Sequence, residues 1–261
     1  MADGGAPARA REALEELLWP TRCVGCNLPG ELLCERCRAS LPWIEQRSAC
    51  PVCGAPHGWL TCTECDRSRD HDGEAPTLDE ETPLTSWPVR STICALPFSG
   101  VGAALVSTLK DGHELRLAPI VASIMATSLD EARSWDAPDG RPRFDELRTD
   151  AICFVPATAE AYARRGFDHM ELVSQALGAF LQLPVLDVLA RHKAKDQRAL
   201  GRQERASNLE GTIEVLADVH GLNVLLADDV ITTGSSIRAC AEALLAHGAA
   251  SVTACSLARV C

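Results

Sequence analysis

The sequence NVLLADDVITTGSS, residues 223–236, joins an apolar run to two adjacent carboxylates and a turn rich in hydroxyl groups. The run NVLLAD is typical of a buried strand, and residues 235–248 have the pattern of a helix. A single acidic or hydroxyl side chain is enough to cap the free N–H groups that open a helix. Two neighbouring acids, Asp228 and Asp229, followed by several hydroxyl side chains, exceed that need. The surplus indicates a ligand site where the strand ends.

The turn after the two acids has the composition of a phosphate-binding loop. Ligands of an open parallel sheet bind beyond the carboxyl ends of its strands, and a helix N-terminus binds anions. Gly234 allows the backbone to close around a phosphate, and hydroxyl donors flank it at Thr232, Thr233, Ser235 and Ser236. The carboxylates would repel a phosphate unless they bind another group, and sugar hydroxyls are suitable partners. The stretch therefore predicts a site for a sugar 5-phosphate, with both acids at the exposed end of the strand.

Strand-like and helix-like blocks alternate from residue 91 onward. The predicted strands are 91–98, 151–156, 184–189, 223–228 and 251–260, and the predicted helices are 101–132, 159–182 and 235–248. This alternation predicts an α/β domain over residues 91–261, with a mostly parallel sheet and helices on both faces. A loop is expected at 135–150, and a short hairpin turning at HGLN is expected within 211–224.

Eight of the thirteen cysteines form four CxxC pairs within residues 20–66. Two such pairs complete a tetrahedral site of four thiolates, so eight ligands predict two structural Zn²⁺ ions. A redox function explains one CxxC pair before a helix but not four in series. Sequential and interleaved pairing both remain open from the spacing. The predicted ligands are Cys23, Cys26, Cys34, Cys37, Cys50, Cys53, Cys62 and Cys65.

The composition predicts four segments. Residues 1–19 are expected to be a helix or a flexible lead, 20–66 a double zinc ribbon, 67–90 an acidic linker, and 91–261 the α/β domain. A module as short as 20–66 buries little core, so metal removal is expected to unfold it and leave the α/β domain folded. The other five cysteines are expected in the core.

Charge and hydropathy exclude several classes of protein. No apolar stretch approaches the roughly 18 residues that span a bilayer, and the first residues lack the basic-then-apolar order of a secretory signal. We therefore expect no membrane insertion and a cytoplasmic location. The net charge of −11 argues against a surface coated with basic groups for nucleic acid. The stretch 191–205 nevertheless has six basic residues against two acidic ones and offers a local basic groove.

The segment DDVITTGSS, residues 228–236, resembles the 5-phosphoribosyl-1-pyrophosphate (PRPP) motif of type I phosphoribosyltransferases. In that family the two acids hold the ribose hydroxyls and the T-T-G turn holds the 5′-phosphate. The resemblance thus implies a catalytic role for Asp228 and Asp229 and phosphate binding by residues 232–236.

Three further segments resemble the ComF family, whose members pair a double zinc ribbon with a phosphoribosyltransferase domain. They are RRGFDHMELVSQAL (164–177), FSGVGAALVSTLKDG (98–112) and RHKAKDQRALGRQERASNLEGTI (191–213). The chain departs from the family pattern where Asp168 replaces Asn, Asp111 replaces an aromatic residue and Ile213 replaces Phe. None of these departures touches the phosphate loop.

The resemblance also implies groups for the pyrophosphate. The loop at Pro156 and Ala157 matches the one that receives pyrophosphate in related transferases, with a plain strand-to-helix turn as the alternative. Arg165 is expected to neutralise the pyrophosphate, with a solvated face as the alternative, and Mg²⁺ is expected to travel with PRPP. His169, His192 and His247 have no identifiable partners in the sequence and are assigned no role.

Two functions follow from the resemblance. In the first, the protein transfers a phosphoribosyl group from PRPP to an unidentified acceptor by electrostatic stabilisation of an oxocarbenium-like sugar. In the second, it is a non-catalytic or regulatory module that handles single-stranded DNA, because ComF relatives are associated with DNA uptake during competence. The basic stretch 191–205 resembles the mobile hood over the site and is the expected contact for substrate or nucleic acid.

Overall fold

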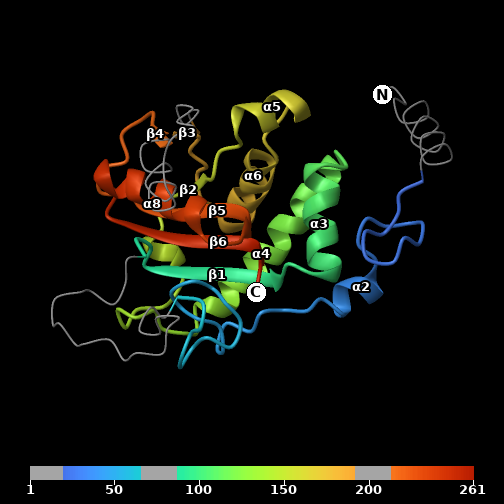
Figure 1. Ribbon diagram of the computed structural model, residues 1–261, viewed down its shortest axis with the longest axis horizontal. Coiled ribbons are helices and arrows are strands. Elements are labelled where there is room, and N and C mark those ends of the chain that lie inside the picture. The colour runs from blue at the N-terminus through green and yellow to red at the C-terminus, as the bar shows by residue number, and fades with distance from the viewer. Residues whose placement is uncertain (1–19, 66–86, 192–212) are drawn as a thin grey trace, which may run out of the picture. The chain divides into compact units, whose positions relative to one another are not determined.

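The computed structural model describes residues 20–65, 87–191 and 213–261 (Figure 1). The chain divides into two compact units, Met1–Leu41 and Pro42–Cys261. The predicted lead at 1–19, nearly all of the acidic linker and most of the basic stretch 191–205 lie outside the described residues. Among the residues that are described, no helix is both long and apolar enough to cross a membrane.

The larger unit is built on a parallel sheet of four strands in the order β1-β6-β5-β2 (Figure 1). All three strand pairs are parallel, which confirms the predicted fold class. Because the inner strands are covered on both faces, they read as continuous apolar runs rather than alternating ones. The strands are β1 (Ser91–Pro97), β2 (Ala151–Phe154), β5 (Asn223–Ile231) and β6 (Ser251–Arg259).

Helices cover both faces of this sheet. On one face, Leu226 and Ala254 share a buried cluster with Ile237 of α8 (Ser235–Ala246). Neighbouring strand residues such as Leu225 and Cys255 point the other way and are equally buried. That second face is packed by α4 (Ala118–Ala132) and α6 (His169–Leu181).

Two predicted helices are each divided in the structure. The helix expected at 101–132 is divided into α3 (Gly100–Lys110), a 3₁₀ turn (Leu115–Leu117) and α4, with a left-handed residue at His113 in the break. The helix expected at 159–182 is divided into α5 (Ala159–Arg165) and α6 by Gly166, whose φ of +78° ends α5 in a left-handed cap.

The strand predictions need two corrections. The segment 184–189 enters the parallel sheet only through a bridge from Val185 to Ile152. The chain then forms β3 (Leu189–Arg191), which pairs antiparallel with β4 (Ile213–Val215), so the hairpin expected within 211–224 is replaced by this pairing. The loop expected at 135–150 includes one 3₁₀ turn, Glu146–Arg148.

Each unit contains one group of four cysteines. The smaller unit has a short helix, α2 (Glu35–Ala39), which begins directly after Cys34 and carries Cys37. In the larger unit, the segment 42–65 is bonded to β1. The backbone N–H of Ile44 donates to the carbonyl of Ala95 at 2.8 Å, and that of Thr92 donates to the carbonyl of Pro51 at 3.0 Å. The second cysteine group is therefore part of the same compact unit as the parallel sheet.

Candidate functional site

The two acids lie inside β5 rather than after it. Asp228 and Asp229 are each only 8% exposed, because the strand continues to Ile231. This corrects the expectation that both carboxylates stand at an exposed strand end. Burial of two adjacent acids requires partners for their charge.

Asp229 is bound by two side chains from distant parts of the sequence. Its Oδ2 atom lies 2.8 Å from His169 Nε2 and 2.9 Å from Lys110 Nζ. The other ring nitrogen of His169, Nδ1, lies 2.8 Å from Nη1 of Arg165. An arginine can only donate, so Nδ1 accepts and Nε2 carries the proton that is donated to Asp229. The result is a chain of contacts from Arg165 through a neutral His169 to Asp229 and Lys110.

The two carboxyl groups differ in their ionisation. Burial and the neighbouring charge of Asp229 raise the pKa of Asp228 well above its usual range. Burial alone would raise the pKa of Asp229 too, but the hydrogen bond from His169 and the charge of Lys110 lower it. The carboxyl group of Asp229 therefore ionises at a lower pH than that of Asp228.

The predicted phosphate loop has the expected form. Gly234 has a φ of +76° and directly precedes α8, while Thr232 and Thr233 are exposed. A Cβ atom at position 234 would lie 1.9 Å from the ring of Trp87, so only glycine fits there. Exposed hydroxyl groups beside the open end of a 12-residue helix form an arrangement that can bind a phosphate.

The loop at Pro156 and Ala157 is tied to the next helix. The backbone N–H of Ala157 donates to Oδ2 of Asp168 at 2.7 Å, and Asp168 also caps α6 through the N–H of Met170. Thr158 caps α5. These bonds give the loop a structural function, so its proposed binding of pyrophosphate requires Ala157 to exchange a partner.

Arg165 is only 7% exposed and also donates to the carbonyl of Ala161, so it does not lie on a solvated face. His169, to which the sequence assigned no role, is the side chain that joins Arg165 to Asp229. Its position four residues after Arg165 was only a weak sequence signal for this contact, because Arg165 ends α5 and His169 begins a separate helix, α6.

The eight predicted zinc ligands form two groups in sequential pairing, one with Cys23, Cys26, Cys34 and Cys37, the other with Cys50, Cys53, Cys62 and Cys65. Within each group the sulfur atoms lie within 4.8 Å of one another. Pairs of sulfurs lie 3.5 to 3.7 Å apart, close to the ~3.8 Å edge of a tetrahedron with Zn–S bonds of ~2.3 Å. The donor sets therefore fit two structural zinc ions.

Of the remaining cysteines, Cys94, Cys153, Cys240 and Cys255 are fully buried, as expected for core residues, and burial raises the pKa of each thiol. Cys261 is exposed, which corrects the prediction of core packing for that residue.

Comparison with known proteins shows which family of proteins this chain resembles. Residues 162–260 match the model of the phosphoribosyl transferase domain. The DNA utilization protein YhgH of Salmonella typhi is 28% identical over 92% of this chain and 97% of that protein. The YhgH protein of Escherichia coli K12 is also 28% identical, with the same coverage. Competence protein F of Haemophilus influenzae is 30% identical over 42% of this chain and 50% of that protein.

The resemblance to the ComF family is confirmed. It rests on the phosphoribosyl transferase domain, on these relatives and on the two cysteine groups of a double zinc ribbon. A solved hypoxanthine phosphoribosyltransferase from Trypanosoma cruzi covers 56% of this chain and 68% of its own, at 14% identity and a TM-score of 0.32. A likeness at that level carries no argument about function.

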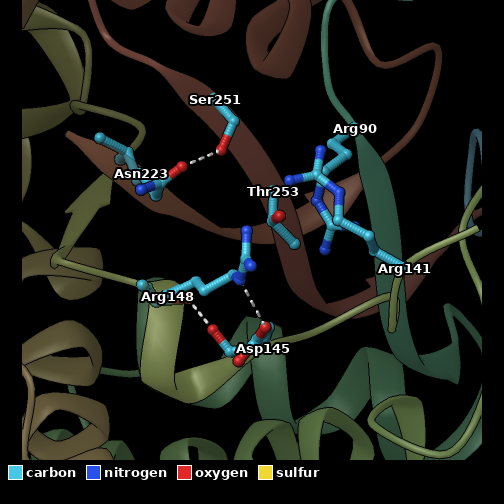
Figure 2. Close-up of a pocket in the computed structure, with 9 residues that line it drawn as sticks. Arg90, Arg141, Asp145, Arg148, Asn223, Ser251 and Thr253 are labelled. Atoms are coloured by element: carbon cyan, nitrogen blue, oxygen red, sulfur yellow. Dashed lines mark hydrogen bonds and ion pairs between the residues drawn. The ribbon is translucent and has the colours of Figure 1, made fainter. Parts of the chain in front are cut away.

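A concave region of this ComF-like chain lies at the amino ends of the strands. Figure 2 shows it between the first residues of β5 and β6, where Ser251 donates to Asn223. Its arginines are already paired with carboxylates, Arg148 with Asp145 and both Arg90 and Arg141 with Asp139. The ligand site predicted from the sequence lies at the carboxyl ends of the strands, where β5 leads into α8.

Proposed function

We propose that this ComF-like protein binds PRPP through the ribose 5-phosphate site formed by β5, the loop 232–234 and α8. The observation that supports the proposal is the direct succession of a buried acid pair, a glycine-specific turn and a helix start. In this site residues 232–236 would bind the 5′-phosphate, and Asp228 and Asp229 would face the ribose hydroxyls.

The contacts of the acid pair suggest how the site would handle charge. Asp229 already accepts from Lys110 and His169, so a metal ion bound directly to its Oδ2 would have to displace them. We therefore place Mg²⁺ on the pyrophosphate oxygens of PRPP, where it would neutralise the leaving group. Asp229, held ionised, would stabilise positive charge that develops on the sugar.

Transfer of the phosphoribosyl group is the finer part of this proposal. The test is release of pyrophosphate from PRPP and Mg²⁺ in the presence of candidate acceptors, with Asp229→Asn as the inactive comparison. Binding of PRPP without release of pyrophosphate under any acceptor would leave a binding module and remove the transferase.

A second candidate function has support from the names of the relatives, which are described as DNA utilization and competence proteins. We propose that the partner in this second function is single-stranded DNA, bound through the basic stretch 191–205. Lys193, Lys195 and Arg198, the residues expected to make that contact, lie outside the described residues. Fluorescence anisotropy of a labelled oligonucleotide at two salt concentrations tests it, because phosphate contacts weaken steeply with salt. Absence of binding at low salt would exclude this function.

A cytoplasmic location stays a prediction and accords with the reduced thiols that zinc binding needs.

A further inference from the structure

One buried arginine connects the second cysteine group to the phosphate loop. Arg259, the last residue of β6, is only 4% exposed. Its Nε donates to the carbonyl of Cys53 at 3.1 Å, and its Nη1 donates to the carbonyl of Thr232 at 2.7 Å and to that of Ile231 at 3.3 Å. A single rigid guanidinium thus joins a metal-ligand turn to the first residue of the loop.

The same arginine also reaches the other ligand pair of this group. Its Nη2 lies 3.7 Å from Oε2 of Glu64, which stands between Cys62 and Cys65. Both CxxC turns of the second group are therefore within reach of one side chain. The planar fork of arginine suits this geometry, because lysine has a single charged centre and cannot span several acceptors.

Trp87 forms a second connection between the same two regions. It packs against the buried cluster of Cys50, Cys53, Ala55 and Cys62, and its ring lies directly on Gly234. The indole Nε1 donates to Thr92 Oγ1 at 3.2 Å, and that hydroxyl donates to the carbonyl of Val52 at 2.6 Å. The guanidinium of Arg238 in α8 stacks 5.2 Å from the ring centre. The loop is therefore held from two sides by groups that rest on the cysteine turns.

The charges of this region suit a loaded metal centre. Zinc bound by four thiolates carries two net negative charges, and Arg259 brings a buried positive charge beside it. A second guanidinium, Arg143, is likewise buried and only 1% exposed. With the metal removed, the turn that presents the Cys53 carbonyl loses the bonds that hold its two thiolates, and Arg259 keeps only Glu64 as a neighbouring anion.

We infer that Arg259 is a positioning residue through which metal at Cys50, Cys53, Cys62 and Cys65 fixes the phosphate loop. Loss of the second zinc ion releases the carbonyl of Thr232 and the contact of Trp87 with Gly234, so the loop loses the shape that binds phosphate. The first group of four cysteines belongs to the smaller unit. The inference rests on the proposed ribose 5-phosphate site for its functional consequence but not for its structural one.

The first test needs no ligand. Amide hydrogen exchange of residues 231–237 is compared between the wild type and the variant Cys62→Ser/Cys65→Ser, with Cys34→Ser/Cys37→Ser as the matched control that loses the other ion. We expect about tenfold faster exchange in the loop for the first variant only, because the bonds from Arg259 to the carbonyls of Ile231 and Thr232 no longer hold it. Equal exchange in both variants and the wild type would overturn the inference, whether or not the protein binds ribose 5-phosphate.

The second test keeps both metal ions. Arg259→Gln should retain two zinc ions and an unchanged circular dichroism spectrum, yet bind ribose 5-phosphate about tenfold more weakly in calorimetry. Coupling of binding free energies is reciprocal, so saturating ribose 5-phosphate should tighten zinc binding about tenfold in equilibrium competition with a chromogenic chelator, in the Cys34→Ser/Cys37→Ser background, and lose that effect when Arg259→Gln is added. Wild-type affinity in Arg259→Gln, or a ligand effect on zinc affinity that survives it, would contradict the role of Arg259. If the wild type binds no ribose 5-phosphate, the proposed function fails and the hydrogen-exchange result alone decides the inference.

Discussion

His169 Nε2 donates to Asp229 Oδ2 across 2.8 Å, between residues that are 60 positions apart in the sequence. The contact joins the first turn of α6 to the strand that bears the acid pair, and both side chains are buried. Because Arg165 can only donate to Nδ1, the proton of the contact with Asp229 is on Nε2 of His169. The acid pair is thus pre-organised by the protein before any ligand arrives.

Replacement of His169 tests the value of that contact. His169→Ala removes one acceptor of Arg165 and one donor to Asp229, both buried, so the free energy of unfolding should fall by about 1–3 kcal/mol. Urea unfolding followed by circular dichroism measures the change. His247→Gln, at an exposed histidine that contacts only its own helix, is the control and should stay within about 0.5 kcal/mol of wild type. Equal stability of the two variants would show that the buried contact contributes nothing.

The raised pKa of Asp228 predicts a pH-dependent gain of stability in Asp228→Asn. Above the unfolded-state pKa of about 4, the unfolded chain releases this proton more readily than the folded one, which disfavours folding. The amide removes that penalty. The gain in unfolding free energy should therefore be small at pH 4 and grow as the pH rises to 7. A gain that is the same at both pH values would argue against a raised pKa of Asp228.

Asp229→Asn should behave in the opposite way. The folded-state pKa of Asp229 is lowered, so its ionised form stabilises the fold above about pH 4, and this contribution is lost as the pH falls. The variant should be less stable than the wild type by the same amount at pH 7 and pH 5, and this difference should shrink only as the pH falls below about 4. The two substitutions are isosteric and adjacent, so each is the control for the other.

Several features of the fold were predictable from local patterns. Alternating strand-like and helix-like blocks predicted the parallel sheet, and the CxxC spacing predicted the two cysteine groups, because each depends on neighbours in the sequence. Contacts between distant residues were not predictable. His169 meets Asp229, and Thr92 meets Val52, only after the sheet has formed. Because the contact of Thr92 with Val52 joins β1 to the segment of the second cysteine group, the expectation that metal removal unfolds a separate module now applies only to the first group.

The steric role of Gly234 is tested by a matched pair of glycines. Gly234 and Gly221 both have a φ of +76°, but a Cβ atom at Gly221 would meet nothing within 4 Å, whereas one at Gly234 would overlap the ring of Trp87. Both alanine variants pay the backbone strain, and only Gly234→Ala adds overpacking of about 1–3 kcal/mol. Thermal unfolding gives the comparison. Identical losses would mean that Trp87 moves aside without cost.

The metal content follows from the sequential cysteine groups. Elemental analysis of protein purified without added metal should give close to two zinc ions per chain, and Cys34→Ser/Cys37→Ser should give close to one. A ratio near zero, with the thiols kept reduced, would show that the two groups are packed cysteines and not metal sites.

The measurement that bears most directly on the central claim is calorimetric titration of the zinc-loaded protein with PRPP and Mg²⁺. We predict saturable binding at one site per chain, competition by ribose 5-phosphate, and loss of that binding in Asp228→Asn/Asp229→Asn under conditions where circular dichroism shows the variant to be folded. Absence of binding by the folded wild type, or undiminished affinity in the folded double variant, would contradict the assignment of this site.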